Sequence, residues 1–407
     1  MSLKKIPADS MGSKVVVLTL MATIFIALMG VGFVIPFLPV LASNLGASEF
    51  GLGMIAAVFA LSMGISQPLA GSLSDRYGRK RFLLVGLSVF SVCGFAYTTA
   101  SSVLDITIIR FIQGFGAGMV FPVAMAYMGD LAPSNSEGRY MAIFNISLLA
   151  GIGSGPLIGG ILKDAFGMSA AFYAMGIFGA LAWLLALLVL PESRSNEALK
   201  ATNTILHVFR SILADRRMRG ILLARMGVML AIFPSFVFLP VLMTENMGAT
   251  GTQIGIVITM RTLLSAALQF PFGWLADKYS RLVLTIFSIL AMAILVSSFG
   301  FSVKFWHVMF IFTSMGVIEA IFMPTTSAMA LDSGRSFGMG STMGVFNTAM
   351  SGGMFFGALA AGLLVERFGF GLAFTIIGAV VGFTGLLAAP MIQDSKQKQG
   401  GKISIRK

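Results

Sequence analysis

The chain has 407 residues, of which 57% are hydrophobic and only 11% are charged, and its formal net charge is +12. Soluble domains carry about 25% charged residues, so this composition excludes a water-soluble globular protein and indicates a membrane protein. Cys93 is the single cysteine, which excludes a disulfide framework, and the sequence contains no GxxxxGK[ST] phosphate-binding loop. We therefore expect neither an enzyme nor an ATP-driven pump, with no metal and no cofactor.

Apolar segments long enough to cross a bilayer recur along the whole chain. A helix of about 20 apolar residues spans the hydrocarbon core. We predict twelve spans, with bounds 14–42, 49–72, 81–101, 105–129, 140–162, 169–190, 219–243, 251–273, 282–303, 306–331, 342–364 and 370–391. The first is long enough to span and lacks a small-residue cleavage site, so it is not expected to be a removable signal peptide.

The last six spans repeat the first six at a constant offset. Residues 71–80 read GSLSDRYGRK and residues 273–281 read GWLADKYSR, which is an offset of 202 residues from Gly71 to Gly273. The same offset relates Asp130 to Asp332. We predict an all-α membrane protein of two pseudo-symmetric six-helix bundles, one in residues 1–194 and one in residues 219–407, the latter ending in a cytoplasmic tail.

The segment between the bundles, residues 195–218, has apolar residues at helical spacing interleaved with basic ones, such as Ile205 and Phe209 with Arg210. This pattern predicts a basic amphipathic helix on the inner membrane surface. A flexible linker with no other role is the alternative.

Orientation follows from the distribution of Lys and Arg. Of 28 such residues, 22 fall in the loops and termini on one side, whereas the other side has only Lys163, Lys304 and Arg367. Positively charged loops remain in the cytoplasm, so both termini are predicted to be cytoplasmic. The net positive charge thus reflects membrane topology, and a nucleic-acid partner is not expected.

Three further segments narrow the class. Residues 151–160 read GIGSGPLIGG, residues 32–39 read GFVIPFLP, and residues 110–118 read RFIQGFGAG. With the paired loops and the twelve spans, the whole chain resembles the major facilitator superfamily (MFS) of secondary transporters, and these segments are similar to its drug:proton antiporter branch. The resemblance implies the MFS fold, a monomer, and a place in the cytoplasmic membrane of a bacterium.

The paired loops have a mechanical interpretation. In the resembled family they act as a cytoplasmic latch that engages when the transporter opens outward. The latch residues implied here are Gly71, Asp75, Arg76, Gly78, Arg79, Gly273, Asp277 and Arg281. Arg76 and Arg79 are expected to pair across the cytoplasmic seam. A weaker second latch is expected because Ser280 stands where the first copy has glycine, and simple anchoring of the loops by their positive charge is the alternative.

The fifth span carries a stripe of small residues around a proline. Its motif residues are Gly151, Gly155, Pro156, Gly159 and Gly160. Such a helix can bend and approach its neighbours closely. The resemblance places the motif at the seam between the halves and associates it with exporters, whereas ordinary helix packing is the alternative.

Charges within the spans are the sharpest functional signal, because each costs about 2.5–3.5 kcal/mol to insert. Glu319 is the only acid well inside a span, and a rise of 1.5 Å per residue gives Arg261 a depth in the membrane that differs from that of Glu319 by only about 4–5 Å. We expect these two residues to couple protons and, with Arg110 and Gln113, to bind substrate. A static structural ion pair is the alternative.

These features predict a proton-coupled exporter of amphipathic small molecules, of the multidrug efflux type that confers drug resistance, which works by alternating access. The partners expected are the substrate, protons and the lipid bilayer, and the proton gradient is the energy source. Two arginines against one acid leave open a carrier of organic anions or a lipid flippase. A membrane sensor that transports nothing is a further alternative.

Overall fold

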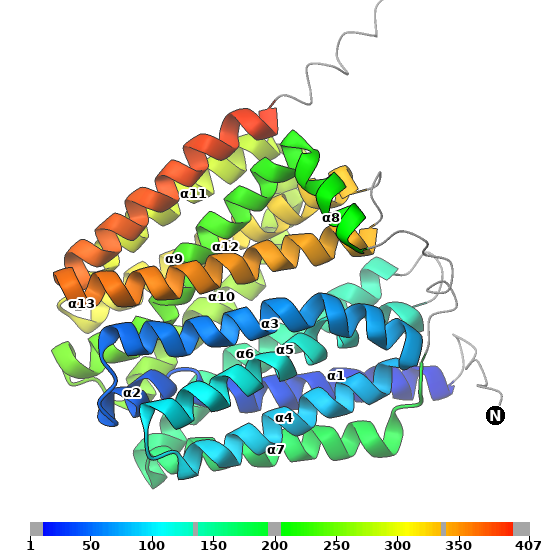
Figure 1. The fold of residues 1–407 in the computed structure, drawn as a ribbon, viewed down its shortest axis with the longest axis horizontal. Coiled ribbons are helices and arrows are strands. Elements are labelled where there is room, and N and C mark those ends of the chain that lie inside the picture. The colour runs from blue at the N-terminus through cyan, green and yellow to red at the C-terminus, as the bar shows by residue number, and fades with distance from the viewer. Residues whose placement is uncertain (1–10, 133–136, 194–204, 335–338, 394–407) are drawn as a thin grey trace, which may run out of the picture.

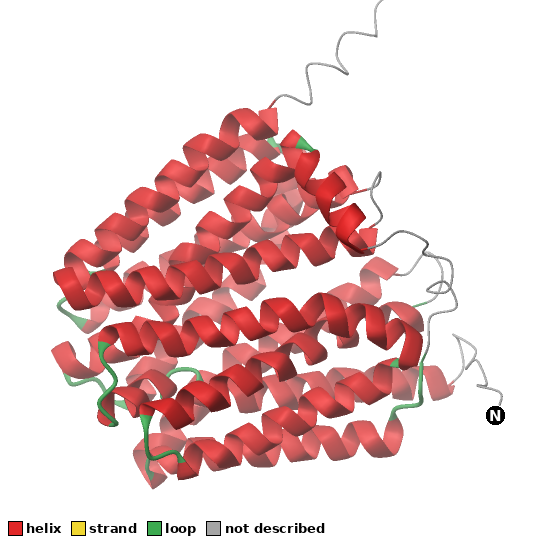
Figure 2. Cartoon of the chain, viewed as in Figure 1, coloured by secondary structure: helices red, strands yellow, loops and turns green. Residues whose placement is uncertain are grey.

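The structure is a computed structural model that describes residues 11–132, 137–193, 205–334 and 339–393. These residues form helices joined by short loops, with no strand among them (Figure 2). The N-terminal half contains α1 (Met11–Val34), α2 (Leu38–Asn44), α3 (Glu49–Tyr77), α4 (Arg79–Thr99), α5 (Val103–Leu131), α6 (Glu137–Phe166) and α7 (Met168–Val189). The remainder contains α8 (Ile205–Ala214), α9 (Arg216–Met247), α10 (Gly251–Lys278), α11 (Arg281–Phe299), α12 (Phe305–Gly334) and α13 (Met339–Gln393).

Eleven segments of the described chain are long and apolar enough to cross a membrane. The first consists of α1 and α2, which are separated by a turn at Pro36, where the proline ring cannot continue the helical hydrogen bonding. The last is α13, which contains two crossings because Gly369 adopts a φ of 72°, a value that favours glycine, and the chain reverses there (Figure 1). All twelve predicted spans are therefore helical, and the predicted fold class is confirmed.

The helices extend beyond the predicted apolar runs because polar residues form their ends. For example, α3 continues to Tyr77, although its predicted span ends at residue 72. Of the segment between the bundles, residues 195–204 lie outside the described residues, and α8 follows as a short helix with Ile212 buried and Arg210 exposed. Whether α8 lies on a membrane surface stays a prediction.

The 202-residue repeat is visible in backbone geometry. Gly167 has a φ of 86° between α6 and α7, and Gly369 holds the equivalent position in the second half. Ser48 caps the N-terminus of α3 with its hydroxyl, and Thr250 caps α10 in the same way. Since both turns and caps recur at the same offset, the two halves share the same local backbone structure at these positions.

The halves meet along two helix pairs, α3 with the first part of α13 and α6 with α10 (Figure 1). We call the side that carries residues 71–81 and 273–281 the motif side, and the opposite side the far side. Near the far side the backbones almost touch: a Cβ added to Gly53 would lie 3.0 Å from the Cα of Gly362, and one added to Gly160 would lie 2.9 Å from the Cα of Thr252. The seam is tightly closed there.

Toward the motif side the same two helices separate. A Cβ on Gly64 would still lie 3.0 Å from the Cβ of Ser351. Seven residues further along each helix, about 10 Å, a Cβ on Gly71 or on Gly344 would have nothing within 4 Å. Along α3 and α13 the two halves are thus apart on the motif side, whereas both helix pairs are close together on the far side.

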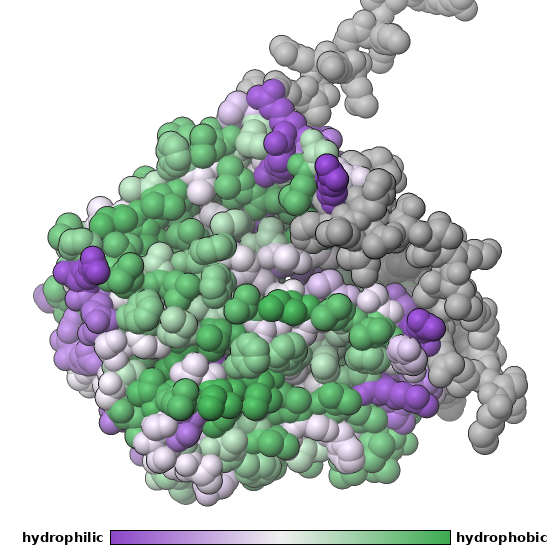
Figure 3. Space-filling model, viewed as in Figure 1, coloured by the Kyte–Doolittle hydropathy of each residue, from purple (hydrophilic) through white to green (hydrophobic). Residues whose placement is uncertain are grey.

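The outer surface is apolar around the middle of the molecule. Figure 3 shows hydrophobic residues across the centre of the visible face and hydrophilic residues at its two ends. Large apolar side chains such as Phe270, which is 90% exposed, and Ile146, which is 65% exposed, project from the helices. Exposure of so extensive an apolar patch to water is unfavourable, whereas lipid would cover it, as expected of a multi-pass membrane protein.

Candidate functional site

Arg261 and Glu319 form an ion pair near the middle of the C-terminal half. Arg261 Nη2 donates to Glu319 Oε2 at 3.0 Å, and the arginine side chain is completely buried. They meet because α10 packs against α12 and because Gly316, one turn before Glu319, leaves room: a Cβ there would lie 2.7 Å from the carbonyl oxygen of Arg261. The sequence placed these two residues at similar depth, and the structure brings them into contact.

The pair is sparsely supported. The guanidinium of Arg261 lies over the rings of Phe236 and Phe312, with its central carbon 4.1 and 4.7 Å from their centroids. Its Nε and Nη1 have no hydrogen-bond partner. One carboxylate oxygen and two aromatic faces therefore hold this charge. Glu319 is 20% exposed, which makes it the member of the pair that water or a ligand can reach.

Arg110 and Gln113 form a separate cluster on α5 in the N-terminal half. Arg110 Nη1 donates to Gln113 Oε1 at 2.9 Å, and the hydroxyl of Tyr97 donates to the same oxygen at 2.7 Å. The guanidinium lies over the ring of Phe59, 4.8 Å from its centroid. Arg110 also borders a small cavity whose lining includes Val237 of α9. No carboxylate pairs with Arg110 in the described part of the chain, and the cluster touches neither Arg261 nor Glu319.

A third intramembrane arginine, Arg225 on α9, had no role in the sequence analysis. It is 7% exposed. Its Nη1 contacts the sulfur of Met323, its Nη2 lies 3.4 Å from the sulfur of Met350, and the ring of Phe346 lies 4.7 Å from its central carbon. Met323 lies one turn after Glu319 on the same face of α12, so Arg225 contacts that helix close to the acid. Among the described residues, Arg225 and Arg261 are thus two buried arginines near a single carboxylate, which pairs with Arg261 alone.

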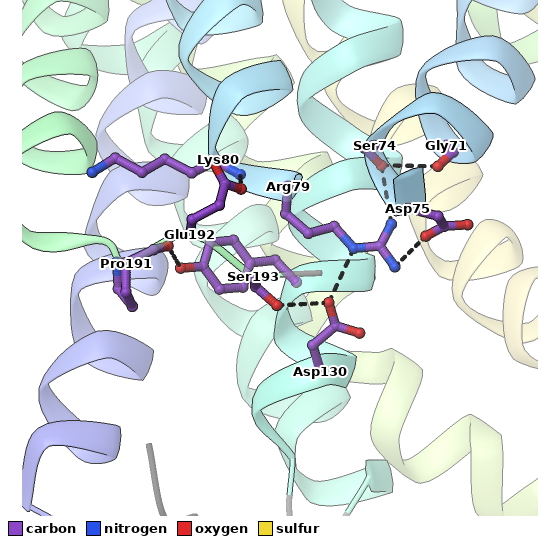
Figure 4. Close-up of polar contacts among 10 residues, drawn as sticks. Gly71, Ser74, Asp75, Arg79, Lys80, Asp130, Pro191, Glu192 and Ser193 are labelled. Atoms are coloured by element: carbon purple, nitrogen blue, oxygen red, sulfur yellow. Dashed lines mark hydrogen bonds and ion pairs between the residues drawn. The ribbon is translucent and has the colours of Figure 1, made fainter. Parts of the chain in front are cut away.

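On the motif side, Arg79 organises a network of polar contacts (Figure 4). It pairs with Asp75, one turn earlier, and its Nε donates to Asp130 Oδ2 at 3.0 Å. Its Nη1 donates to the hydroxyl of Ser74 at 3.0 Å, and Ser193 donates to the same oxygen of Asp130. All of these partners belong to the N-terminal half, so Arg79 makes no pair across the seam with any described side chain.

Arg76, the other arginine expected at the seam, is exposed and lies over the ring of Tyr77, 5.5 Å from its centroid. In the second copy of the loop, Arg281 Nη1 donates to Asp332 Oδ2 at 2.6 Å, which reproduces the Arg79–Asp130 contact at the 202-residue offset. The side chain of Asp277 lies outside the described side chains.

Gly78 and Ser280 show why the two loops differ. Gly78 has a φ of 108°, and a Cβ there would lie 2.5 Å from the carboxyl carbon of Glu192, which accepts the backbone N–H of Lys80 at 3.0 Å. Ser280 has an ordinary φ of −62° as the N-cap of α11. The second loop thus turns without the strained backbone that required glycine in the first.

The 151–160 motif lies where the resemblance placed it, at the seam. Its glycines at positions 151, 155 and 159 face α1; a Cβ on Gly155, for example, would lie 2.6 Å from the Cα of Gly32. Gly160 faces α10 across the seam, as does Pro156, against which Gly255 packs. The N–H of Leu157 donates to the hydroxyl of Thr259 at 3.2 Å across the same seam. α6 stays helical through Pro156.

The far side is closed by two carboxylates in a symmetric arrangement, which we call the far-side clamp. Asp164 of α6 accepts the N–H groups of Gly251 and Thr252, at 2.9 and 2.7 Å, and the Thr252 hydroxyl at 2.6 Å. Glu366 of α13 accepts the N–H of Phe50 at 2.8 Å and the hydroxyl of Ser48 at 3.0 Å. Each acid therefore caps the first turn of a helix in the opposite half.

The clamp was absent from the sequence analysis, although one signal was available. Asp164 and Glu366 are separated by the repeat offset of 202 residues. The same is true of Ser43 and Glu245, whose side chains meet at 3.3 Å across the seam. Paired polar residues at span ends, related by the repeat, lie on opposite sides of the pseudo-symmetry axis and can face each other.

Comparisons with known proteins agree with this architecture. The family model of the Major Facilitator Superfamily matches residues 20–243 and 221–407. An MFS-type transporter of Methanocaldococcus jannaschii, described as uncharacterised, is 30% identical over 375 residues, covering 89% of this chain and 95% of that protein. Quinolone resistance protein NorA of Staphylococcus aureus strain COL is 27% identical over 349 residues, covering 84% and 88%.

Among solved structures, the human organic anion transporter MFSD10 (TETRAN) superposes with a TM-score of 0.67 at 17% sequence identity, covering 94% of this chain and 99% of that one. At this identity the likeness concerns the fold. With the family model spanning both six-helix halves and with two full-length relatives, the chain belongs to the Major Facilitator Superfamily of transporters.

Proposed function

We propose that the protein is a proton-coupled exporter of amphipathic small molecules in the cytoplasmic membrane, and that Glu319 is the residue that carries the proton. The observation that carries this proposal is the Arg261–Glu319 pair. Its carboxylate is the only acid well inside a span, and it is the partly exposed member of the pair. Intramembrane acids in such positions serve proton relays in transporters.

Coupling follows from the competition for one carboxylate. When Glu319 is ionised, Arg261 is neutralised and held between α10 and α12. When Glu319 takes a proton, Arg261 retains only the faces of Phe236 and Phe312, which stabilise a charge less than an ion pair does. Proton binding thereby loosens the contact between the two helices. Substrate that occupies the carboxylate favours proton release, so the two ligands exchange.

Alternating access is supported by the asymmetry of the seam. If the termini are cytoplasmic, as the Lys and Arg distribution predicts, the motif side faces the cytoplasm and this conformation is open inward. The far-side clamp then holds the outer gate shut. In the same conformation the described partners of Arg79 all lie in its own half, as expected of a latch that is not engaged. No cofactor or second subunit is required by this scheme.

Efflux is favoured over uptake by the 151–160 motif at the seam and by the likeness to NorA, which is named for quinolone resistance. The energetics suffice. One proton moved across about 100 mV supplies about 2.3 kcal/mol, which supports roughly a 50-fold gradient of a neutral substrate.

The test is transport in proteoliposomes with an imposed pH gradient, using wild type, Glu319→Gln and Glu245→Gln. The last is a matched control because Glu245 is an exposed acid at the far side. Wild type and the control should accumulate an amphipathic amine when the gradient is applied. Glu319→Gln should lose gradient-driven accumulation while it still exchanges labelled for unlabelled substrate. Gradient-driven accumulation by Glu319→Gln at the wild-type rate would show that Glu319 does not carry the proton.

Carriage of organic anions is the second candidate, because the spans contain three arginines and a single acid well inside them. MFSD10, which shares the fold, is described as an organic anion transporter. In the same proteoliposomes an anion carrier would accumulate an amphipathic carboxylate and ignore the amine.

A further inference from the structure

Arg225 is a buried cation with no acidic partner among the residues that the structure describes. Only 7% of it is exposed. Its hydrogen-bonding neighbours are the thioether sulfurs of Met323 and Met350, and its Nε has no partner. Thioethers are weak acceptors, whereas a guanidinium offers five N–H donors. A charge removed from water in this way is unfavourable unless a counter-charge joins it, and no carboxylate is hydrogen-bonded to Arg225 in the described part of the chain.

The position of Arg225 makes that anion a ligand. Met350, which it contacts, precedes Ser351, and Ser351 lies against Gly64, one heptad before α3 and α13 separate at Gly71 and Gly344. Phe346, one turn closer to the motif side, lies over the guanidinium. Arg225 is therefore at the level where the seam opens, covered by side chains with rotatable bonds. Methionines adapt to varied shapes, so these two can move aside for a ligand.

The charges of Arg225, Glu319 and Arg261 determine which charged groups the ligand should have. Glu319 is paired with Arg261, and Arg225 contacts Met323, which lies one turn after Glu319 on the same face of α12. The cluster thus has two positive charges around one negative. A simple anion bound at Arg225 would repel Glu319 and help it to keep its proton, which opposes exchange of proton for substrate. A molecule with an anionic group at Arg225 and a cationic group at Glu319 continues the alternation of charge and competes with the proton.

We propose that Arg225 binds the anionic group of a zwitterionic amphipathic substrate, whose cationic group lies at Glu319 and whose apolar body lies against Phe346 and the two methionines. This assignment rests on the proposed function, because it names the substrate class of the same site. A carboxylate suits Arg225, since the guanidinium binds both of its oxygens with parallel hydrogen bonds. Arg225 then supplies selectivity, and Glu319 supplies coupling.

The experiment measures binding of three pyrene compounds by fluorescence to protein in phosphatidylcholine nanodiscs, with no gradient present. Pyrenylalanine is the zwitterion, pyrenebutylamine the cation and pyrenebutyrate the anion. Arg225→Met should raise the Kd of pyrenylalanine about 10- to 100-fold, as expected for loss of a charge-assisted hydrogen-bonded pair. It should leave the Kd of pyrenebutylamine within about twofold. Arg367→Met, which removes an exposed arginine at the far side, is the matched control and should change neither.

Two outcomes would overturn the assignment. An equal loss of affinity for the zwitterion and the cation would make Arg225 a structural residue, and an unchanged Kd of pyrenylalanine would place its carboxylate elsewhere. If Arg225→Met does not insert, Arg225→Lys serves instead. It retains the charge but not the planar fork, so it should weaken pyrenylalanine several-fold and spare pyrenebutylamine.

Because binding needs no gradient, failure of this assignment and failure of the proposed function are separable. Selective loss of the zwitterion in a protein that moves nothing along a pH gradient would keep the assignment and refute proton-coupled export. Gradient-driven transport with unaltered zwitterion binding in Arg225→Met would do the reverse.

Discussion

Removing the two carboxylates of the far-side clamp should open the far side. Asp164 and Glu366 each accept hydrogen bonds from the first turn of a helix in the other half, and these bonds exist only while the far side is closed. In the opposite conformation water must take over both the carboxylates and the helix ends. Asp164→Ala and Glu366→Ala therefore destabilise one conformation and leave the other almost unchanged.

The magnitude follows from the contacts of Asp164. It accepts three hydrogen bonds at the N-terminus of α10. Loss of a capping side chain costs about 1 kcal/mol, and loss of a negative charge near a helix N-terminus costs about 0.3–1 kcal/mol more. The single variant should thus shift the equilibrium between the two conformations about 10- to 30-fold toward the far-side-open one. The two carboxylates act on different helix pairs, so their effects should be roughly additive in free energy.

The assay is pulsed electron paramagnetic resonance with spin labels at Asn44 and Asn246, in a Cys93→Ala background. Both asparagines are exposed at the far side, and the repeat relates them. The double variant should add a population at longer distance. Asp105→Ala is the matched control, since Asp105 also accepts several hydrogen bonds at the far side but all from its own half. An unchanged distribution in the double variant, or an equal change in the control, would refute the reasoning.

Three substitutions test other parts of the structure. Arg110→Lys keeps the charge but loses the fork, so transport should fall about tenfold with normal insertion. Gly78→Ala places a side chain at a φ of 108° and against Glu192. The free energy of unfolding should fall by about 1–3 kcal/mol, so the protein should unfold at a lower temperature. Gly155→Ala forces a Cβ against the backbone at Gly32 and should separate α6 from α1, with a stability loss of similar size in the same thermal assay.

The two glycine variants have matched controls. Ser280→Ala, at the equivalent turn with an ordinary backbone, should unfold at the wild-type temperature, as should Gly352→Ala, which meets nothing within 4 Å. Equal stability of a test variant and its control would contradict the steric argument. For Arg110→Lys, transport at the wild-type rate would remove that residue from the site.

The fold was predictable because its determinants, the long apolar segments and the internal repeat, are features of the sequence itself. A bilayer selects long apolar helices, and the repeat at 202 residues then fixes two equal bundles without any knowledge of contacts. The boundary between the eleventh and twelfth spans is an example. Hydropathy predicted a break between residues 364 and 370, and in the structure the chain reverses at Gly369, which has a positive φ. Helix ends were less predictable because they depend on caps such as Ser48 and Thr250 rather than on hydropathy.

The site was only partly predictable. Depth along a helix placed Arg261 beside Glu319, since rise per residue is constant. Depth alone gave no role to Arg225, because its significance lies in the missing acid around it, and that depends on packing of α12 and α13. The far-side clamp escaped for a similar reason. A carboxylate at a span end usually meets water, and only the docked halves turn Asp164 and Glu366 into caps.

The conformation itself was beyond the sequence. Glycines that would allow close approach of the helices occur at both ends of the seam, so the sequence does not say which end is closed. Gly53 meets Gly362 at the far side, whereas Gly71 and Gly344 on the same two helices lie apart. The balance between the ends depends on a few polar contacts of about 1 kcal/mol each, and such small differences are a property of the folded state.

Proton release on substrate binding tests the central claim, that Glu319 exchanges its proton for substrate, most directly. Purified protein in weakly buffered solution, with a pH indicator, is mixed with pyrenebutylamine across a series of starting pH values. Wild type and Glu245→Gln should release up to one proton per chain within a defined pH range, and Glu319→Gln should release none while it still binds the amine. Proton release by Glu319→Gln equal to that of wild type would contradict the account.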